Sequence, residues 1–269
     1  MEIPFSRWYP AIAARKSRRQ FDISKAIPND MIAGLKKVCD EFRPFKGARA
    51  EFLAGKVDNI FTGFIGSYGK IKGASYAVLF IGDQKEENFQ EFVGYIGEAV
   101  ILEATSLGLG TCWVGGSFSA GVASKRLDLK AGEKVLAVTP VGFVPGEKTA
   151  EEKLASSLAR SSMRKPLASL VSGIGEDQWQ DWVKKALEAA RLAPSGINMQ
   201  PWLFRVEPDG ILVSEKATAL SRVKSRRLDC GIAMLHIEVA ALASGVTGTW
   251  ELLENPQVAR FKASRPAVK

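Results

Sequence analysis

The most informative stretch of the sequence is A-P-S-G-I-N-M-Q-P-W, residues 193–202. It follows the run 179–192, whose apolar residues recur at helical spacing, and it precedes an extended apolar run, 203–206. A Pro-Ser-Gly turn followed by Asn198 and Gln200 places short hydrogen-bonding side chains on a constrained loop. These residues alone leave two interpretations open: a helix-to-strand connection that only satisfies its own backbone, or a ligand-binding loop.

The composition indicates an ordinary globular protein. Of the 269 residues, 46% are hydrophobic and 25% are charged, enough for one large domain or two small ones. No apolar run reaches the roughly 18 residues that a membrane span needs, and the charged N-terminal region does not resemble a signal peptide. The three cysteines are odd in number and widely spaced, which predicts neither a disulfide framework nor a metal site. We therefore expect a cytoplasmic protein without a membrane partner.

A single histidine restricts the chemistry that side chains could perform. His236 alone cannot build a multi-histidine metal site, and any triad would have to use it. It lies in an apolar run, 234–239, which predicts a packed structural role. A bound cofactor is therefore expected to supply the chemistry. The net charge of +8 suits anionic ligands. The basic residues are scattered along the chain, which does not predict a nucleic-acid partner.

The pattern P-S-x-x-N-x-Q-P-W resembles the flavin-contacting loop of the nitroreductase family, the FMN-dependent NAD(P)H oxidoreductases. The resemblance implies an α+β fold with an α/β-type mixed sheet flanked by helices. In the homodimers of this family the loop reaches across the subunit interface to the flavin. It implies cofactor-binding roles for five residues of the loop: Pro194, Ser195, Gly196, Asn198 and Gln200.

A basic run near the N-terminus, 15–19, reads R-K-S-R-R and resembles the R-x-S-x-R motif of the same family. Taken alone, such a run is typical of a solvated helix end. The resemblance implies that Arg15, Lys16 and Ser17 hold the ribityl-phosphate arm of FMN. It places Arg19 near the N1/C2 edge of the flavin, where a cation would stabilise charge that develops during hydride transfer. Arg19 is thus the candidate catalytic residue.

Two further segments complete the predicted site. The segment 108–116, G-L-G-T-C-W-V-G-G, resembles the family's flavin-facing segment, where glycines let the backbone approach the ring. Cys112 within it is expected to pack rather than to react. A basic residue before Lys165-Pro166 corresponds to a phosphate contact of the family. The residues implied are Trp113, Val114, Gly115, Gly116 and Arg164.

The sequence also contains a weak internal repeat. Arg15-Lys16 recurs as Arg164-Lys165, and the series Gly94, Gly108, Trp113 recurs 137 positions later. We interpret the chain as a fused duplication, with a first half over 1–160 and a shorter, diverged half over 161–269 packed as one unit. Chance similarity between two α/β halves is the alternative. The second half is expected to lack an equivalent of the predicted strand 134–144.

The two halves differ in the residues that matter for binding. An offset of 150 places Phe45, Ala48 and Ala50 opposite Ser195, Asn198 and Gln200, so the first half lacks a polar loop. The phosphate motif is in turn lost from the second half, where Pro166 and Ala168 face Ser17 and Arg19. The sequence therefore predicts one FMN between the halves of a monomer.

The expected function is ping-pong hydride transfer from NADH or NADPH, through FMN, to a small-molecule acceptor. Nitroaromatics, quinones or similar flat electrophiles are the expected acceptors, and a non-catalytic flavin-binding or sensing protein is the alternative. The Gly-rich segment 47–73 is expected to be a loop over the site. The choice of nicotinamide donor stays open, since surface charge is the favoured role of the four basic residues that could meet a 2′-phosphate: Arg126, Lys224, Arg226 and Arg227.

Overall fold

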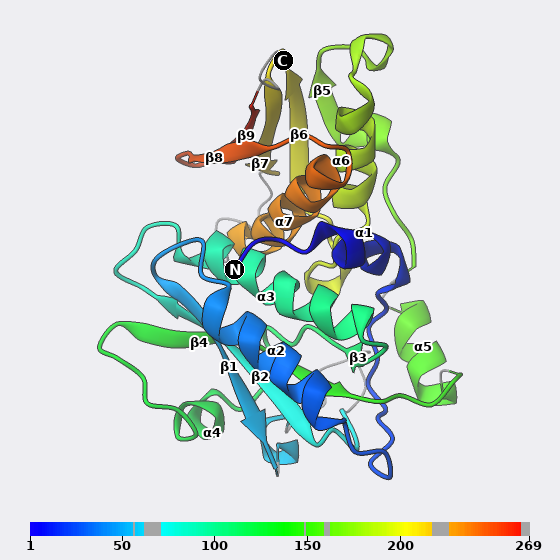
Figure 1. Cartoon of the computed structure of the whole chain (residues 1–269), viewed down its shortest axis with the longest axis vertical. Coiled ribbons are helices and arrows are strands. Elements are labelled where there is room, and N and C mark those ends of the chain that lie inside the picture. Colours follow the sequence, from blue (N-terminus) through cyan, green and yellow to red (C-terminus); the bar gives the residue numbers. More distant parts are fainter. Residues whose placement is uncertain (56, 62–70, 148, 159–161, 217–225, 265–269) are drawn as a thin grey trace.

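The computed structural model describes residues 1–55, 57–61, 71–147, 149–158, 162–216 and 226–264. They form two sheets flanked by helices, a mixed α+β fold. Figure 1 shows the sheets at opposite ends of the molecule, with helices between them. Among the described residues, no helix is both long and apolar enough to cross a bilayer.

The first half of the chain builds a four-stranded antiparallel sheet in the order β1-β2-β4-β3. Strand β2 is buried along nearly its whole length. The elements of the first half are α1 (Phe5–Ala14), α2 (Asn29–Glu41), β1 (Ala48–Ala54), the 3-10 turn η1 (Asp58–Phe61), β2 (Tyr76–Asp83), α3 (Phe89–Ser106), β3 (Gly110–Thr111), α4 (Ala120–Ser124), β4 (Glu133–Gly142) and α5 (Ala150–Leu158).

The second half builds a five-stranded sheet in the order β5-β6-β7-β9-β8. Only the β5–β6 pair is parallel. Its elements are the 3-10 turn η3 (Leu167–Ser169), β5 (Val171–Gly173), the 3-10 turn η4 (Glu176–Gln178), α6 (Asp181–Arg191), the 3-10 turn η5 (Gly196–Asn198), β6 (Trp202–Glu207), β7 (Gly210–Glu215), α7 (Arg227–Ala243), β8 (Gly248–Leu252) and β9 (Gln257–Ala263).

The two halves repeat one order of elements. The series α2-β1-β2-α3-β3-β4 is matched by α6-β6-β7-α7-β8-β9, and the strand order β1-β2-β4-β3 is matched by β6-β7-β9-β8. The expectation that the second half lacks a final strand is therefore wrong, because β9 occupies the place of β4. The sequence of β9, Q-V-A-R-F-K-A, does not show the regular alternation that indicates a strand, because the buried Val258 and Ala259 are adjacent and polar residues separate only the later positions.

Helices α3 and α7 cross at the centre of the molecule, where close backbone contacts require glycine (Figure 1). A Cβ at Gly94 would lie 2.0 Å from the carbonyl oxygen of Leu228, and one at Gly231 would lie 2.0 Å from that of Glu91. The contacts are reciprocal, because 228 − 91 and 231 − 94 both equal 137. A contact between residue i of one unit and residue j of the other, matched by its converse, is the pattern of a two-fold axis.

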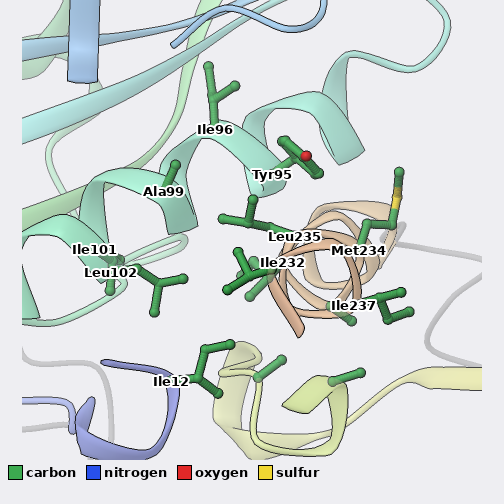
Figure 2. Packing of buried hydrophobic residues seen from close by; sticks show 14 of the residues in the cluster. Ile12, Tyr95, Ile96, Ala99, Ile101, Leu102, Ile232, Met234, Leu235 and Ile237 are labelled. Atoms are coloured by element: carbon green, nitrogen blue, oxygen red, sulfur yellow. The ribbon is translucent and has the colours of Figure 1, made fainter. Parts of the chain in front are cut away.

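Apolar side chains of both halves form one core around this crossing. Figure 2 shows Leu102 of α3 on the side of Ile232 and Leu235 of α7, with Ile12 of α1 below them. Burial of these side chains from both halves ties the two sheets together, at roughly 1.5–3 kcal/mol for each fully buried aliphatic residue.

Two expectations about loops are corrected by the structure. The segment 47–73 is not one long loop, because it contains β1 and η1; its residues 62–70 lie outside the described residues. Ala48 and Ala50 belong to β1, where they pair with Gly82 and Phe80. They are therefore not counterparts of Asn198 and Gln200. The first half connects helix to strand through residues 42–47 only, whereas the second half uses 192–201.

Candidate active site between the two halves

One cavity lies where the segment after α1, the segment after β3, the loop 194–198 and the first turns of α7 meet. Both halves contribute to it. The predicted site residues that line the cavity are Arg15, Ser17, Arg19, Trp113, Gly115, Arg164, Pro194, Ser195, Gly196 and Asn198. Those that do not line it are Lys16, Val114, Gly116 and Gln200.

The basic run at 15–19 is extended, not the end of a helix. Helix α1 stops at Ala14, Ser17 forms a bridge with Thr111, and the Arg18 N–H donates to the Thr111 carbonyl at 2.8 Å. Successive side chains of an extended segment point to opposite sides. Residues 15, 17 and 19 therefore face the cavity, whereas Lys16 is exposed on the other side. Lys16 therefore does not line the cavity, and its role at the phosphate stays a prediction.

Three arginines bring positive charge to the cavity. The Arg15 side chain is only 7% exposed, and its buried Nε has no hydrogen-bond partner among the described residues. Burial, followed by the charges of Arg15 and Arg191, lowers the pKa of Arg164 to about 10. Arg19 is also buried. Neighbouring buried cations with an unused donor favour a bound anion, because an anion supplies both the charge and the hydrogen bonds.

The loop from the second half is held in an unusual backbone conformation. Ile197, Asn198 and Gln200 have φ values of 45°, 56° and 49°, in the left-handed region that non-glycine residues seldom adopt. The Gly196 N–H donates to Asp229 Oδ1 at 3.1 Å, and the Gln200 N–H donates to Ser195 Oγ at 2.9 Å. Strain of this kind costs on the order of 1–3 kcal/mol per residue and is concentrated at functional sites.

Two polar side chains of the loop have different positions. Asn198 lines the cavity; its Nδ2 donates to the Met163 carbonyl at 3.0 Å, and its Oδ1 accepts from Arg164 Nη1 at 3.3 Å. Gln200 is buried below the loop, where its Oε1 accepts the Lys165 N–H at 2.8 Å. Gln200 therefore fixes the segment that carries Arg164 and does not line the cavity itself.

The backbone after Trp113 differs from the prediction in part. The Val114 N–H donates to Val138 at 2.9 Å and its carbonyl accepts from Val138 at 3.0 Å, so neither group can serve a ligand. Gly116 is exposed outside the cavity. Gly115 does line it, and a Cβ there would have no atom within 4 Å. Only Gly115 of these three residues presents open space to the site.

Trp113 forms the cavity wall on the side of helix α3. Its ring covers Gly97, where a Cβ would lie 2.4 Å from the ring, and its Nε1 donates to Glu98 Oε2 at 2.7 Å. Cys112 also lines the cavity, and burial raises the pKa of its thiol. A buried thiol that stays protonated is a poor nucleophile, in agreement with the expected packing role.

Sequence reasoning missed the contribution of helix α7. Leu228, Asp229 and Ile232 line the cavity from its first turns. Asp229 is the acidic residue of the first turn and anchors the loop through Gly196. In the sequence, only the basic residues that precede it were considered. The sequence signal that could have indicated this contribution is the acidic Asp229 in the first turn of the helix, since a carboxylate there can accept from a backbone N–H of a neighbouring loop.

The basic residues considered for a 2′-phosphate do not converge on this cavity. Arg227 is buried and pairs with Glu91 at 2.6 Å, so it is not a surface charge. Arg126 donates to the Ala54 carbonyl at 3.3 Å, and neither it nor Arg226 lines the cavity. Lys224 lies outside the described residues. Over the same described ranges, no group of three or more His, Cys, Asp or Glu residues could hold a metal ion.

Ile197→Gly is expected to raise the free energy of unfolding by about 1 kcal/mol, because glycine adopts the left-handed conformation without steric cost. Ile197 is 56% exposed, so little packing is lost. Urea unfolding of the two proteins measures the difference. Ile23→Gly, at an exposed isoleucine with no positive φ, should not stabilise the protein. Destabilisation by Ile197→Gly would show that the loop is not strained at this residue.

The two helix-flanked sheets and the cavity between them define the nitroreductase-like α+β class. The chain belongs to the family described as "Putative TM nitroreductase", which matches residues 7–241.

A solved structure of similar length supports the fold. A crystal structure described as a putative nitroreductase from Thermotoga maritima is 17% identical, with a TM-score of 0.63 over 95% of this chain and 93% of that one. A nitroreductase with bound FMN from Bacteroides fragilis is 18% identical, with a TM-score of 0.41 over 53% of this chain and 94% of that one. No curated protein sequence matches this chain significantly.

Proposed function

We propose that the cavity binds FMN and that the protein is an FMN-dependent oxidoreductase, which takes electrons from NADH or NADPH and reduces flat electrophiles such as nitroaromatics or quinones. Membership of the nitroreductase family supports the class of reaction. The observation that supports the cofactor is the pair of Arg15 and Arg164: a buried and a half-buried guanidinium group line one cavity, with an unused donor on Arg15.

The residues present fit the parts of FMN. Arg15 and Arg164 would hold the phosphate together with Ser17, which lines the same cavity. The open space at Gly115 would admit the flat ring, which Pro194 to Asn198 would cover from the second half. Arg19 would lie at the N1/C2 edge as a fixed cation. The chemistry that bound FMN supplies is ping-pong hydride transfer from a nicotinamide donor to an acceptor.

We further propose one site per chain, at the junction of a half over 1–160 and a half over 161–269 that arose by duplication. The offset of 137 places Phe92 and Tyr95 opposite Asp229 and Ile232 of the cavity. Phe45 stacks on Phe92 at 4.4 Å and contacts Tyr95 edge-on at 5.1 Å. Aromatic rings thus occupy the related position, which supports a single flavin site per chain.

Purified protein saturated with FMN is expected to contain one flavin per chain and to be a monomer. Absorbance of the released flavin and light scattering after gel filtration measure both quantities. Two flavins per chain would contradict the single site, and no flavin in the presence of excess FMN would contradict the cofactor.

Turnover separates the proposed enzyme from a protein that only binds or senses flavin. Steady oxidation of NADH or NADPH that depends on an added quinone supports the enzyme. Bound FMN without such turnover supports the alternative. The preferred donor and the cytoplasmic location stay predictions of the sequence.

A further inference from the structure

A buried polar cluster lies directly behind the cavity and is not explained by cofactor contacts alone. Glu98 of α3 is fully buried, with Oε2 accepting from Trp113 Nε1 at 2.7 Å and Oε1 lying 4.0 Å from Arg15 Nε. His236 of α7 is also fully buried and lies with Nε2 3.0 Å from the same Oε1. Glu98 therefore touches two residues of the cavity wall and the single histidine of the chain.

The partners of His236 fix the number of protons in this cluster. Its Nδ1 lies 2.8 Å from the Ala189 carbonyl, which can only accept, so Nδ1 must carry a hydrogen. Its Nε2 faces a carboxyl oxygen, and that contact needs one proton on either the imidazole or the carboxyl group. In both cases the His236–Glu98 pair has no net charge.

Neutralisation of Glu98 has a consequence for Arg15. A buried carboxylate without a partner is costly and would pair with the nearest cation, which is the Arg15 guanidinium at 4.0 Å. In the structure Arg15 does not make that hydrogen bond, and its Nε is unused among the described residues. The proton supplied by His236 explains why this contact stays at 4.0 Å without a hydrogen bond.

We propose that His236 is a positioning residue for the anion site: by sharing a proton with Glu98, it weakens the ion pair of that carboxyl group with Arg15 and keeps the two from hydrogen bonding, so that the guanidinium is available to a phosphate in the cavity. This inference rests on the proposed FMN site. His236 does not touch the cavity itself and acts through Glu98. The second half thus sets the charge of a phosphate contact that belongs to the first half.

The test compares the affinities for FMN and riboflavin, which differ only in the phosphate, by quenching of flavin fluorescence. His236→Gln should weaken FMN binding about tenfold, as expected for one charge-assisted hydrogen bond, and should change riboflavin binding less than about twofold. Glu98→Gln should lose less, because an amide can accept from Trp113 and donate to His236 Nε2. The double variant Glu98→Gln/His236→Gln should recover most of the FMN affinity, since no carboxylate is left to pair with Arg15.

A matched control lies on the same helix as His236. Glu238 is a largely buried carboxyl group that accepts from Trp250 Nε1 at 2.6 Å, but it does not line the cavity. Glu238→Gln should leave the ratio of FMN to riboflavin affinity unchanged. Equal losses for both flavins in His236→Gln, or no recovery in the double variant, would overturn the proposal. Failure of the wild-type protein to bind FMN would instead refute the proposed function.

A measurement on the wild-type protein covers the case in which His236→Gln does not fold. Because the chain has one histidine, the ¹⁵N spectrum of the imidazole needs no assignment. Protonated Nδ1 is expected with and without FMN. A neutral imidazole protonated only at Nε2 would show that the proton is not shared as proposed.

Discussion

Arg15→Ala is expected to weaken FMN binding by about 10- to 100-fold, the effect of losing one buried, charge-assisted contact of about 1.5–3 kcal/mol. Arg15 is chosen because it has a side chain 7% exposed and a buried donor without a partner among the described residues. The loss should fall on FMN and spare riboflavin, which has no phosphate. Fluorescence titration with both flavins measures it.

Lys16→Ala is the matched control for this prediction. It removes the same formal charge from the adjacent position, but the Lys16 side chain points away from the cavity and is exposed. General attraction of anions to a basic protein would be weakened equally by both substitutions. Similar losses in the two variants would therefore assign the affinity to net charge and not to a site at Arg15.

Arg227→Ala is expected to lower the free energy of unfolding by about 3–5 kcal/mol, the cost of leaving a buried charge without its partner. Arg227 Nε and Nη2 lie 3.0 Å and 2.6 Å from Glu91 Oε1, and Glu91 is fully buried. The guanidinium also donates to the carbonyls of Leu253 and Gln257 at 3.0 and 2.9 Å. It therefore joins α3, α7 and the last hairpin, and urea unfolding measures the loss.

Two further variants separate the ion pair from surface charge. Lys184→Ala breaks the pair with Glu176, in which both side chains are more than 60% exposed, and should leave stability nearly unchanged. Arg227→Met/Glu91→Met should recover part of the loss, because it removes both buried charges together. A small effect of Arg227→Ala would mean that water reaches Glu91 in the folded state.

Local patterns in the sequence predicted much of the element order. Helical spacing over 179–192 predicted α6, and the predicted strand 134–144 corresponds to β4, because these elements bury a regular set of side chains. Strand β9 was missed because Arg260 and Lys262 interrupt its short series of buried apolar residues. The flavin loop, 192–201, was aligned with residues beyond the helix-to-strand connection of the first half. That connection, 42–47, is shorter, and no motif in its sequence shows where it ends.

Within the site, motif resemblance identified the two segments that meet at the cavity but not the direction of each side chain. Lys16 was assigned to the site because a sequence motif does not show which way each side chain points. In the extended segment, alternation turns the Lys16 side chain away from the cavity. Gln200 was assigned to the ligand, whereas tertiary contacts direct it to the Lys165 backbone. The roles of the residues that do line the cavity stay predictions until flavin binding is measured.

The sequence by itself determined the family and the kinds of side chain available, because these depend on residue identity and short-range order. Only the tertiary structure decided which residues meet. The crossing of α3 and α7 at Gly94 and Gly231 brings Arg15 and Asn198 to one cavity, and it brings His236 to Glu98. These contacts join residues more than 130 positions apart, and packing of the whole core is what specifies them.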